Sequence, residues 1–423
     1  MPTHYPAEFL NPANFRLAWE RVIRGSNSQY KAFFSYLFPS YEFAHQTILR
    51  DLITEIRLGI YQPSAAVTVF IPKPSRILRP ITLLSLNDQV VYQAIANVIA
   101  NKFYPSLRRY YRVSTFGALY AGRNSQFFYR PWKQDYRAFN GAVSRAHADG
   151  NNILADFDLV SFFDLIDHQV LRGVLARRVK SGELLDLLVD CLGHWTQGGP
   201  NVRKRGHGIP QGPEPSAFLA EVFLHEFDTA KYGRVKYLRY VDDIKLLGKT
   251  FAAVRRALLR LDLHSKSLGL VPQAQKIEIK RVEDIEDELR NLPSSIAGLG
   301  SPTGSRPLSK STKRRLERIL KAALGRVKGE VVVKDETRLK FALYRLPSSA
   351  RVLKLIHTLF RARPDLSGVL GHYASGFASN LRCAEILHNA LKADPVFDAA
   401  AGDYVLALDR SVTCPPKTSP VKT

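Results

Sequence analysis

The chain has 423 residues and carries 61 Lys plus Arg against 38 Asp plus Glu, which gives a formal net charge of +23. A chain of this length can form two or three domains with real hydrophobic cores, and a hydrophobic content of 45% excludes an intrinsically disordered protein. The basic balance favours a polyanionic partner, above all nucleic acid, over an anionic membrane surface.

Cysteine content and hydropathy indicate the compartment. Cys191, Cys383 and Cys414 are an odd set without CxxC spacing, so neither a disulfide framework nor a structural zinc site is predicted. No apolar run reaches the roughly 18 residues of a membrane-spanning helix, and the N-terminal residues lack a signal-peptide pattern. We therefore expect a cytoplasmic protein in a reducing compartment, with no membrane partner.

The pattern of apolar residues changes along the chain. Strand-length apolar runs at 66–72, 151–160 and 236–248 alternate with segments of helical periodicity, which predicts an α+β region. After Asp284 the apolar residues recur three and four apart between Gly, Pro and Ser breaks, which predicts consecutive helices such as RLERILKAALGRV. The final Pro-, Ser-, Thr- and Lys-rich residues are predicted to be a disordered tail.

The most basic segment lies in this helical region. Residues 306–334 contain ten basic residues and two acidic ones, Glu317 and Glu330. Such a run is ordinarily a solvated helix face, but in a chain of this charge it is also a candidate for contact with a nucleic-acid backbone. The candidate contact residues are Lys310, Lys313, Arg314, Arg315 and Arg318.

Paired aspartates are the first sign of chemistry. In RYVDDIKLLG, two β-prone stretches flank an Asp-Asp pair, which predicts a hairpin whose tip presents Asp242 and Asp243. Such a pair alone is ordinarily a turn or a helix cap. With a third carboxylate from a neighbouring strand, however, it could bind two divalent ions for phosphoryl or nucleotidyl transfer.

The third carboxylate has four candidates in LADFDLVSFFDLIDHQVL. Asp164 and Asp167 have the position of helix-start residues, where carboxylates stabilise exposed N–H groups. Asp156 and Asp158 share one face of the preceding strand, and spacing alone does not separate them.

A glycine- and proline-rich loop, GIPQGPEP, lies between these two segments and precedes a helical pattern. A loop of this kind can bring its backbone and the Gln211 amide close to a nucleotide base or a template strand. The alternative is an ordinary capped helix.

Taken in order, these segments resemble the motifs of reverse transcriptases, and in particular the bacterial branch of group II intron and "unknown group" or defence-associated (DRT, Abi-like) enzymes. YVDD resembles the YxDD hairpin, GIPQG the PQG loop, and DLVSFFDLIDH the first aspartate motif. IPKPSRILRPITLLSLNDQ resembles the fingers segment, and STFGALYAGRNS the block that follows it. The resemblance covers roughly residues 15 to 300, and it makes Asp158, not Asp156, the catalytic candidate.

The resemblance implies a role for each matching residue. Asp158, Asp242, Asp243 and Lys276 would be catalytic, with Lys276 assisting departure of pyrophosphate. Two Mg²⁺ ions, with Mn²⁺ as a substitute, would be held by Asp158, Leu159, Asp242 and Asp243. The incoming nucleotide would contact Lys73, Arg79, Phe163 and Gln211, with Phe163 excluding a ribose 2′ hydroxyl. The alternatives are two surface cations for Lys73 and Arg79, and a core aromatic for Phe163.

The implied architecture is a right-hand polymerase followed by an all-α C-terminal thumb or accessory domain. The expected boundaries are 1–100 for an N-terminal extension and fingers, 101–283 for the palm with the remaining fingers, 284–410 for the basic helical domain, and 411–423 for the tail. The retron NAxxH and VTG signatures, clustered RNase H carboxylates and the Cys/His spacing of an intron endonuclease are absent from the sequence.

The expected function is RNA-directed DNA synthesis from dNTPs on an RNA template, in bacterial anti-phage defence with a dedicated noncoding RNA. One alternative is template-independent or protein-primed synthesis, for which the 18 tyrosines offer possible primers. Another is a catalytically idle RNA-binding scaffold, which the clustered carboxylates disfavour because they repel one another without metal. RNA-dependent RNA synthesis is disfavoured by Phe163 and YVDD. Primer, trigger and oligomeric state are not predicted.

Overall fold

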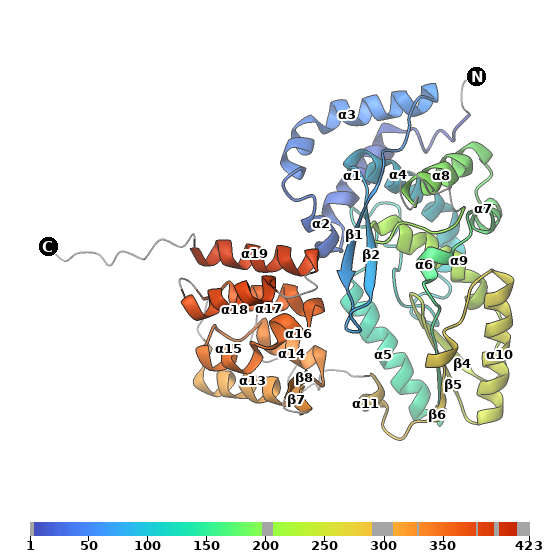
Figure 1. Cartoon of the computed structure of the whole chain (residues 1–423). Helices are drawn as coiled ribbons and strands as arrows, with labels where there is room; N and C mark the ends of the chain where they lie inside the picture. The colour runs from blue at the N-terminus through green and yellow to red at the C-terminus, as the bar shows by residue number, and fades with distance from the viewer. Residues whose placement is uncertain are drawn as a thin grey trace. The chain divides into compact units, whose positions relative to one another are not determined.

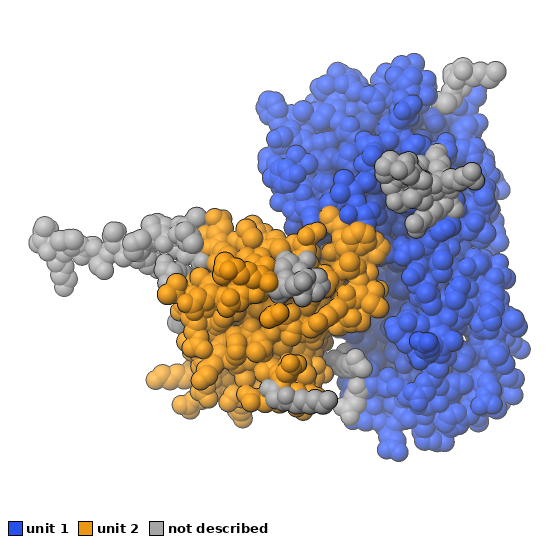
Figure 2. Space-filling view, viewed as in Figure 1, with its two compact units in different colours: residues 1–68, 82–289 blue, residues 69–81, 290–423 orange. Residues whose placement is uncertain are grey.

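Helices and strands are mixed along the chain, as the α+β prediction requires. The computed structural model describes residues 4–196, 206–289, 308–327, 330–377, 380–392 and 397–412. The chain divides into two units, which Figure 2 colours separately. Unit 1 comprises residues 1–68 and 82–289, and unit 2 comprises residues 69–81 and 290–423.

The N-terminal part of unit 1 is helical. Its helices are α1 (Pro12–Arg24), α2 (Ser28–Ala32), α3 (Phe38–Leu58) and α4 (Leu86–Leu107). Helix α4 has apolar residues on all its faces and is buried along most of its length, together with polar side chains such as Asp88, Gln93 and Asn97. It packs against α1 and against α9 (Glu214–Thr229), so it forms the centre of this region.

The predicted strand at 66–72 is confirmed as β1 (Val67–Pro72), which pairs with β2 (Leu78–Leu83) in a two-stranded sheet. A hydrogen bond of 2.8 Å from Lys73 N to Ile77 O closes the connection between the two strands.

The main sheet of unit 1 has four strands in the order β4-β5-β3-β6, and the pairs are antiparallel. The strands are β3 (Ile153–Phe157), β4 (Lys236–Tyr240), β5 (Asp243–Gly248) and β6 (Ile279–Arg281). Helices α5 (Trp132–Ala148) and α10 (Phe251–Ser267) lie on either side of this sheet (Figure 1). Leu154, Leu238 and Leu247 form a core with α5.

The register of β3 and β5 decides which side chains meet. Phe157 pairs with Ile244 and Asp156 pairs with Lys245. Asp158 directly follows Phe157 and Asp243 directly precedes Ile244, so the two aspartates are neighbours at the same end of the sheet. Alternation along each strand puts Asp156, Asp158, Asp243 and Lys245 on the α5 side.

The other elements of unit 1 connect these strands. They are α6 (Phe162–Leu165), α7 (His168–Ala176), α8 (Gly182–Trp195), a 3₁₀ turn η1 (Ala274–Lys276) and α11 (Ile285–Leu289). Asp167 caps α7 by accepting hydrogen bonds from Gln169 N at 2.8 Å and Val170 N at 2.9 Å. The prediction that Asp167 starts a helix is therefore confirmed.

Unit 2 contains α13 (Lys310–Ala323), α14 (Glu336–Leu343), α15 (Ala350–Ile356), α16 (Leu359–Ala362), η2 (Pro364–Leu366), α17 (Ser367–Ala374), α18 (Leu381–Leu391) and α19 (Asp398–Val412). One face of α13 enters a shared core through Leu316, Ile319, Leu320 and Ala323. The basic residues lie mainly on its exposed face.

The expectation of an all-helical region needs one correction. The helix predicted through LGRV ends at Ala323, and β7 (Leu324–Val327) then pairs with β8 (Glu330–Val333). Gly325 disfavours continuation of the helix, and the three consecutive valines of β8 favour a strand.

The described helices include none with the length and apolarity needed to cross a membrane. Cys191 and Cys383 are buried free thiols. Cys414 and the rest of the predicted tail after Val412 lie outside the described residues.

Truncating Leu320 to Ala should destabilise unit 2, because Leu320 is completely buried in its core. The expected loss is about 2 to 5 kcal/mol, the usual cost of a buried leucine. Hydrogen exchange should become faster in α13 to α17 and stay unchanged in β3 and β5. Lys310→Ala, at an exposed position of the same helix, is the control; equal effects of both variants would contradict the prediction.

Candidate active site

The predicted hairpin is confirmed, with Val241 and Asp242 forming the turn between β4 and β5. Asp243, the first residue of β5, is exposed, and Asp242 is half-buried. Val241 has a φ of 57°, in the left-handed region that a β-branched residue adopts only under strain. The turn is therefore held in a conformation that its own sequence disfavours.

Asp158 lies beside this hairpin, directly after β3. Its backbone carbonyl accepts a hydrogen bond of 2.9 Å from Gln273 N. Its carboxylate Oδ2 lies 3.2 Å from Lys276 Nζ. The structure therefore brings Asp158, the adjacent Asp242 and Asp243, and Lys276 from three separate segments to one end of the sheet.

Asp156 has a different partner. Its carboxylate pairs with the ammonium group of Lys245, a buried residue opposite it on β5. Both aspartates therefore face a lysine, but Asp156 lies two residue pairs further into the sheet than Asp158. The sequence alone does not reveal this difference, because Lys245 occupies an ordinary alternating position of a strand.

The electrostatics of Asp243 reflect this gathering of charge. Desolvation by the surrounding protein raises the pKa of Asp243 to about 6, and the carboxylates of Asp156, Asp242 and Asp158 act in the same direction. Lys245 opposes the shift. Asp243 still reaches solvent, so water limits how far the desolvation can act. The carboxylates lie within electrostatic range of one another and repel.

The donor chemistry of this group fits a hard divalent cation, since carboxylate oxygens are the preferred ligands of Mg²⁺. In the part of the chain that the structure describes, no three Asp, Glu, His or Cys residues are already grouped as a metal site. Lys276 and Lys245 instead balance part of the negative charge of Asp158 and Asp156.

The loop that contains Gln211 is fastened to the segment after Asp158. Ile209 N donates a hydrogen bond of 2.8 Å to Phe163 O, and Gly208 N donates one of 2.8 Å to Ile166 O. Gln211 Nε2 donates to Asp164 Oδ1 at 3.1 Å. Asp164 therefore binds the loop and is not one of the clustered carboxylates at the hairpin.

Phe162 and Phe163 differ in how deeply they are buried. Phe162 is 3% exposed and contacts Phe223 in the core, whereas Phe163 remains partly exposed. The two rings meet edge to face with centroids 5.6 Å apart.

Of the other predicted site residues, Leu159 directly follows Asp158, and the rest belong to unit 2. Leu159 is buried and its backbone pairs with Pro272. Its side chain is apolar, so only its main-chain carbonyl could bind a cation. Lys73 and Arg79 are exposed and belong to unit 2, like the basic residues of α13. Lys310, Arg314, Arg315 and Arg318 are exposed, and Lys313 is half-buried.

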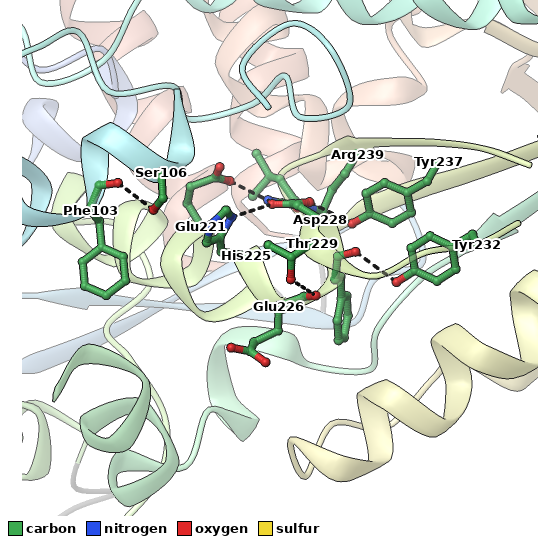
Figure 3. A network of polar contacts seen from close by, with 12 residues as sticks. Phe103, Ser106, Glu221, His225, Glu226, Asp228, Thr229, Tyr232, Tyr237 and Arg239 are labelled. Atoms are coloured by element: carbon green, nitrogen blue, oxygen red, sulfur yellow. Dashed lines mark hydrogen bonds and ion pairs between the residues drawn. The ribbon is translucent and has the colours of Figure 1, made fainter. Parts of the chain in front are cut away.

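The sequence analysis gave no role to a buried charge cluster behind the hairpin (Figure 3). Arg239, the next-to-last residue of β4, is fully buried and donates to Asp228 through Nε at 2.9 Å and through Nη2 at 2.5 Å. Its Nη1 lies 2.8 Å from Glu221 Oε2. The sequence does contain a pattern that indicates this cluster. Glu221, His225 and Asp228 recur at one face of an otherwise apolar helix, and an arginine interrupts an apolar strand.

Burial and pairing oppose each other in this cluster. Burial raises the pKa of Glu221 to about 7, although Arg239 acts in the opposite direction. For Asp228 burial also disfavours the charge, but Arg239 prevails and lowers the pKa. Tyr237 OH donates a further hydrogen bond to Asp228 Oδ1 at 3.1 Å. Asp228 is therefore the principal counterion of Arg239.

Comparisons with known proteins point to one protein family. Residues 71–330 match the family described as "Reverse transcriptase (RNA-dependent DNA polymerase)". Protein YkfC of Escherichia coli K12 is 28% identical over 196 residues, which are 45% of this chain and 46% of YkfC. The group II intron-encoded protein LtrA of Lactococcus lactis is 22% identical over 235 residues, 54% of this chain and 36% of LtrA. The chain thus spans less than half the length of these curated relatives.

Among solved structures, telomerase from Candida albicans in complex with a fragment of telomeric RNA aligns with a TM-score of 0.38 and 10% identity. That alignment covers 83% of this chain and 62% of the telomerase chain.

The buried cluster should make stability depend on pH. Because the pKa of Glu221 is higher in the folded chain than its ordinary value of 4.5, the folded state binds the proton more tightly than the unfolded state. The contribution of Glu221 to the free energy of unfolding therefore falls as pH rises from about 4.5 to about 7.

Glu221→Gln should lack this dependence, so its free energy of unfolding should rise relative to wild type by about 1 to 3 kcal/mol across that interval. Urea titrations at several pH values measure it, with Glu183→Gln as the control at an exposed carboxylate. A difference that is constant with pH would contradict the prediction.

Proposed function

Because the chain belongs to the reverse transcriptase family, we propose that it is an RNA-directed DNA polymerase that extends a primer with dNTPs. The observation that carries this proposal is the placement of Asp158 beside Asp243, with Asp242 in the adjoining turn. Carboxylates so arranged gain nothing structurally from their mutual repulsion. They do provide oxygen ligands for the divalent ions that nucleotidyl transfer uses.

In this proposal, Asp158, Asp242 and Asp243 hold two Mg²⁺ ions, with the Leu159 carbonyl as a further ligand. When bound, the ions lower the pKa of the primer 3′ hydroxyl and stabilise charge on the triphosphate. Lys276, 3.2 Å from Asp158, adds positive charge where pyrophosphate departs. Lys245 keeps the neighbouring Asp156 paired and away from this role.

Nucleotide selection is assigned to Phe163 and Gln211. Phe163 is partly exposed, and the hydrogen bond from Ile209 N to its carbonyl holds its main chain in place. Lys73 and Arg79 supply positive charge for the triphosphate, with the planar arginine suited to phosphate oxygens.

The basic face of α13 is proposed to contact nucleic-acid backbone. Its candidate residues are Lys310, Arg314, Arg315 and Arg318, which are exposed, and Lys313, which is half-buried. Backbone contacts of this kind bind without reading sequence and weaken with salt. The sequence resemblance to defence-associated enzymes further supports a role against phage, with a dedicated noncoding RNA as template. Loss of phage protection in cells that carry Asp242→Asn would test that role.

The two strand aspartates offer a matched test of the chemistry. Asp158→Asn should lower dNTP incorporation at least about a hundredfold, as loss of a group that stabilises developing charge does. Asp156→Asn, two residues earlier on the same face, should retain most of the activity. The assay uses labelled dNTPs, Mg²⁺ and an RNA template with a DNA primer; comparable losses in both variants would contradict the assignment.

The same assay distinguishes the alternatives. Removal of co-purified RNA by RNase should abolish incorporation unless template is added back. Incorporation that survives RNase would favour untemplated or protein-primed synthesis. No incorporation on any template-primer would favour an RNA-binding scaffold.

Phe163→Ala should relax the choice of sugar, because it removes the ring proposed to exclude the 2′ hydroxyl. The ratio of kcat/KM for dNTP over rNTP should fall by about tenfold or more. Phe162→Leu, at the neighbouring core ring, serves as the control. An unchanged ratio in Phe163→Ala would leave Phe163 without a role in sugar selection.

A further inference from the structure

The turn that carries Asp242 has supports that its own sequence does not provide. Val241 is held at a φ of 57°, and a β-branched residue in this region needs outside contacts to stay there. Two such contacts exist, one from Arg239 and one from Gly117, and they reach Val241 through different groups.

Arg239 binds the turn directly. Beyond its bonds to Asp228 and Glu221, its Nη1 donates a hydrogen bond of 2.8 Å to Val241 O. Arg239 points to the face of the sheet opposite Asp243, because side chains alternate along the strand. The guanidinium thus binds the turn from the face of the sheet opposite Asp243.

Gly117 meets the same residue from another segment. The chain at 114–116 runs beside β4, where Phe116 N donates to Arg239 O at 2.9 Å and Arg239 N donates to Ser114 O at 2.7 Å. A Cβ at Gly117 would lie 2.7 Å from Val241 N and would overlap Val241 Cγ2. Only glycine permits this approach of the two backbones.

Holding the turn with this buried charge cluster costs desolvation free energy. Arg239, Glu221 and Asp228 are all buried, and desolvation of such ions offsets much of their attraction. A purely apolar contact could have packed α9 on the sheet. A guanidinium fixed by two carboxylates, however, offers a rigid donor at a defined point.

We propose that Arg239 and Gly117 form a clamp on Val241 that holds Asp242 and Asp243 where they bind metal. Both are positioning residues, since neither is proposed to touch substrate. The inference rests on the proposed polymerase function and adds to it two residues that set the geometry of its hairpin.

The test uses the full chain with Arg239→Lys, which keeps the charge but loses the planar fork, and with Gly117→Ala. Each should lower the rate constant of dNTP addition on a pre-bound template-primer by about ten- to a hundredfold, as small misplacement of catalytic groups does. Template-primer affinity should stay within about threefold of wild type, because neither residue lies on the proposed nucleic-acid face. Amide exchange at 241–243 should become faster.

Rescue separates positioning from stability. Val241→Gly added to Arg239→Lys should restore most of the lost rate, because glycine adopts a positive φ without support. Arg21→Lys is the matched control: Arg21 is also buried and donates to main-chain carbonyls, those of Gly122 at 2.9 Å and Ser125 at 2.8 Å. It should neither speed exchange at 241–243 nor respond to Val241→Gly.

The inference is overturned if Arg239→Lys lowers only the melting temperature, or if Val241→Gly restores nothing. If Arg239→Lys does not fold, the test rests on Gly117→Ala. A wild-type rate of dNTP addition together with wild-type amide exchange at 241–243 in that variant overturns the inference. If the wild type adds no nucleotide, the proposed function fails, and Mn²⁺ binding measured by electron paramagnetic resonance tests the clamp instead. Weaker Mn²⁺ binding in both variants supports it, and equal binding overturns it.

Discussion

Repulsion between carboxylates at the end of one sheet is the constraint on which the rest of unit 1 depends. The antiparallel register of β3 and β5 places Asp158 beside Asp243, and the turn adds Asp242. Lys276 and Lys245 offset part of this charge on the same face. The packing of α5 and α10 on the two sides of the sheet must offset the remaining repulsion.

The two faces of the sheet carry different sets of charged groups. The α5 face carries the carboxylates and their lysines, whereas the opposite face receives Arg239 and the acids of α9. Separation by the thickness of a sheet lets one arginine bind two carboxylates without neutralising those that are proposed to hold metal. The charge proposed to hold the turn and the charges proposed to serve catalysis can therefore coexist within one hairpin.

Much of this arrangement could be predicted from the sequence. The hairpin, the strand before Asp158, the cap at Asp167 and the helix after GIPQGPEP depend on local patterns, and all were found. The β7–β8 hairpin was missed because helical spacing continued into LGRV. The Arg239 cluster was missed because its members lie 11 and 18 positions apart in sequence, and only the fold brings them together.

The loop from Gly208 to Gln211 is attached by the main-chain carbonyls of Phe163 and Ile166 and by the side chains of Asp164 and His168. Every residue type supplies a carbonyl, so the side chain at position 163 can change while the attachment persists. The ring proposed to contact the nucleotide sugar can therefore be exchanged without loss of the main-chain hydrogen bond that joins the loop to position 163.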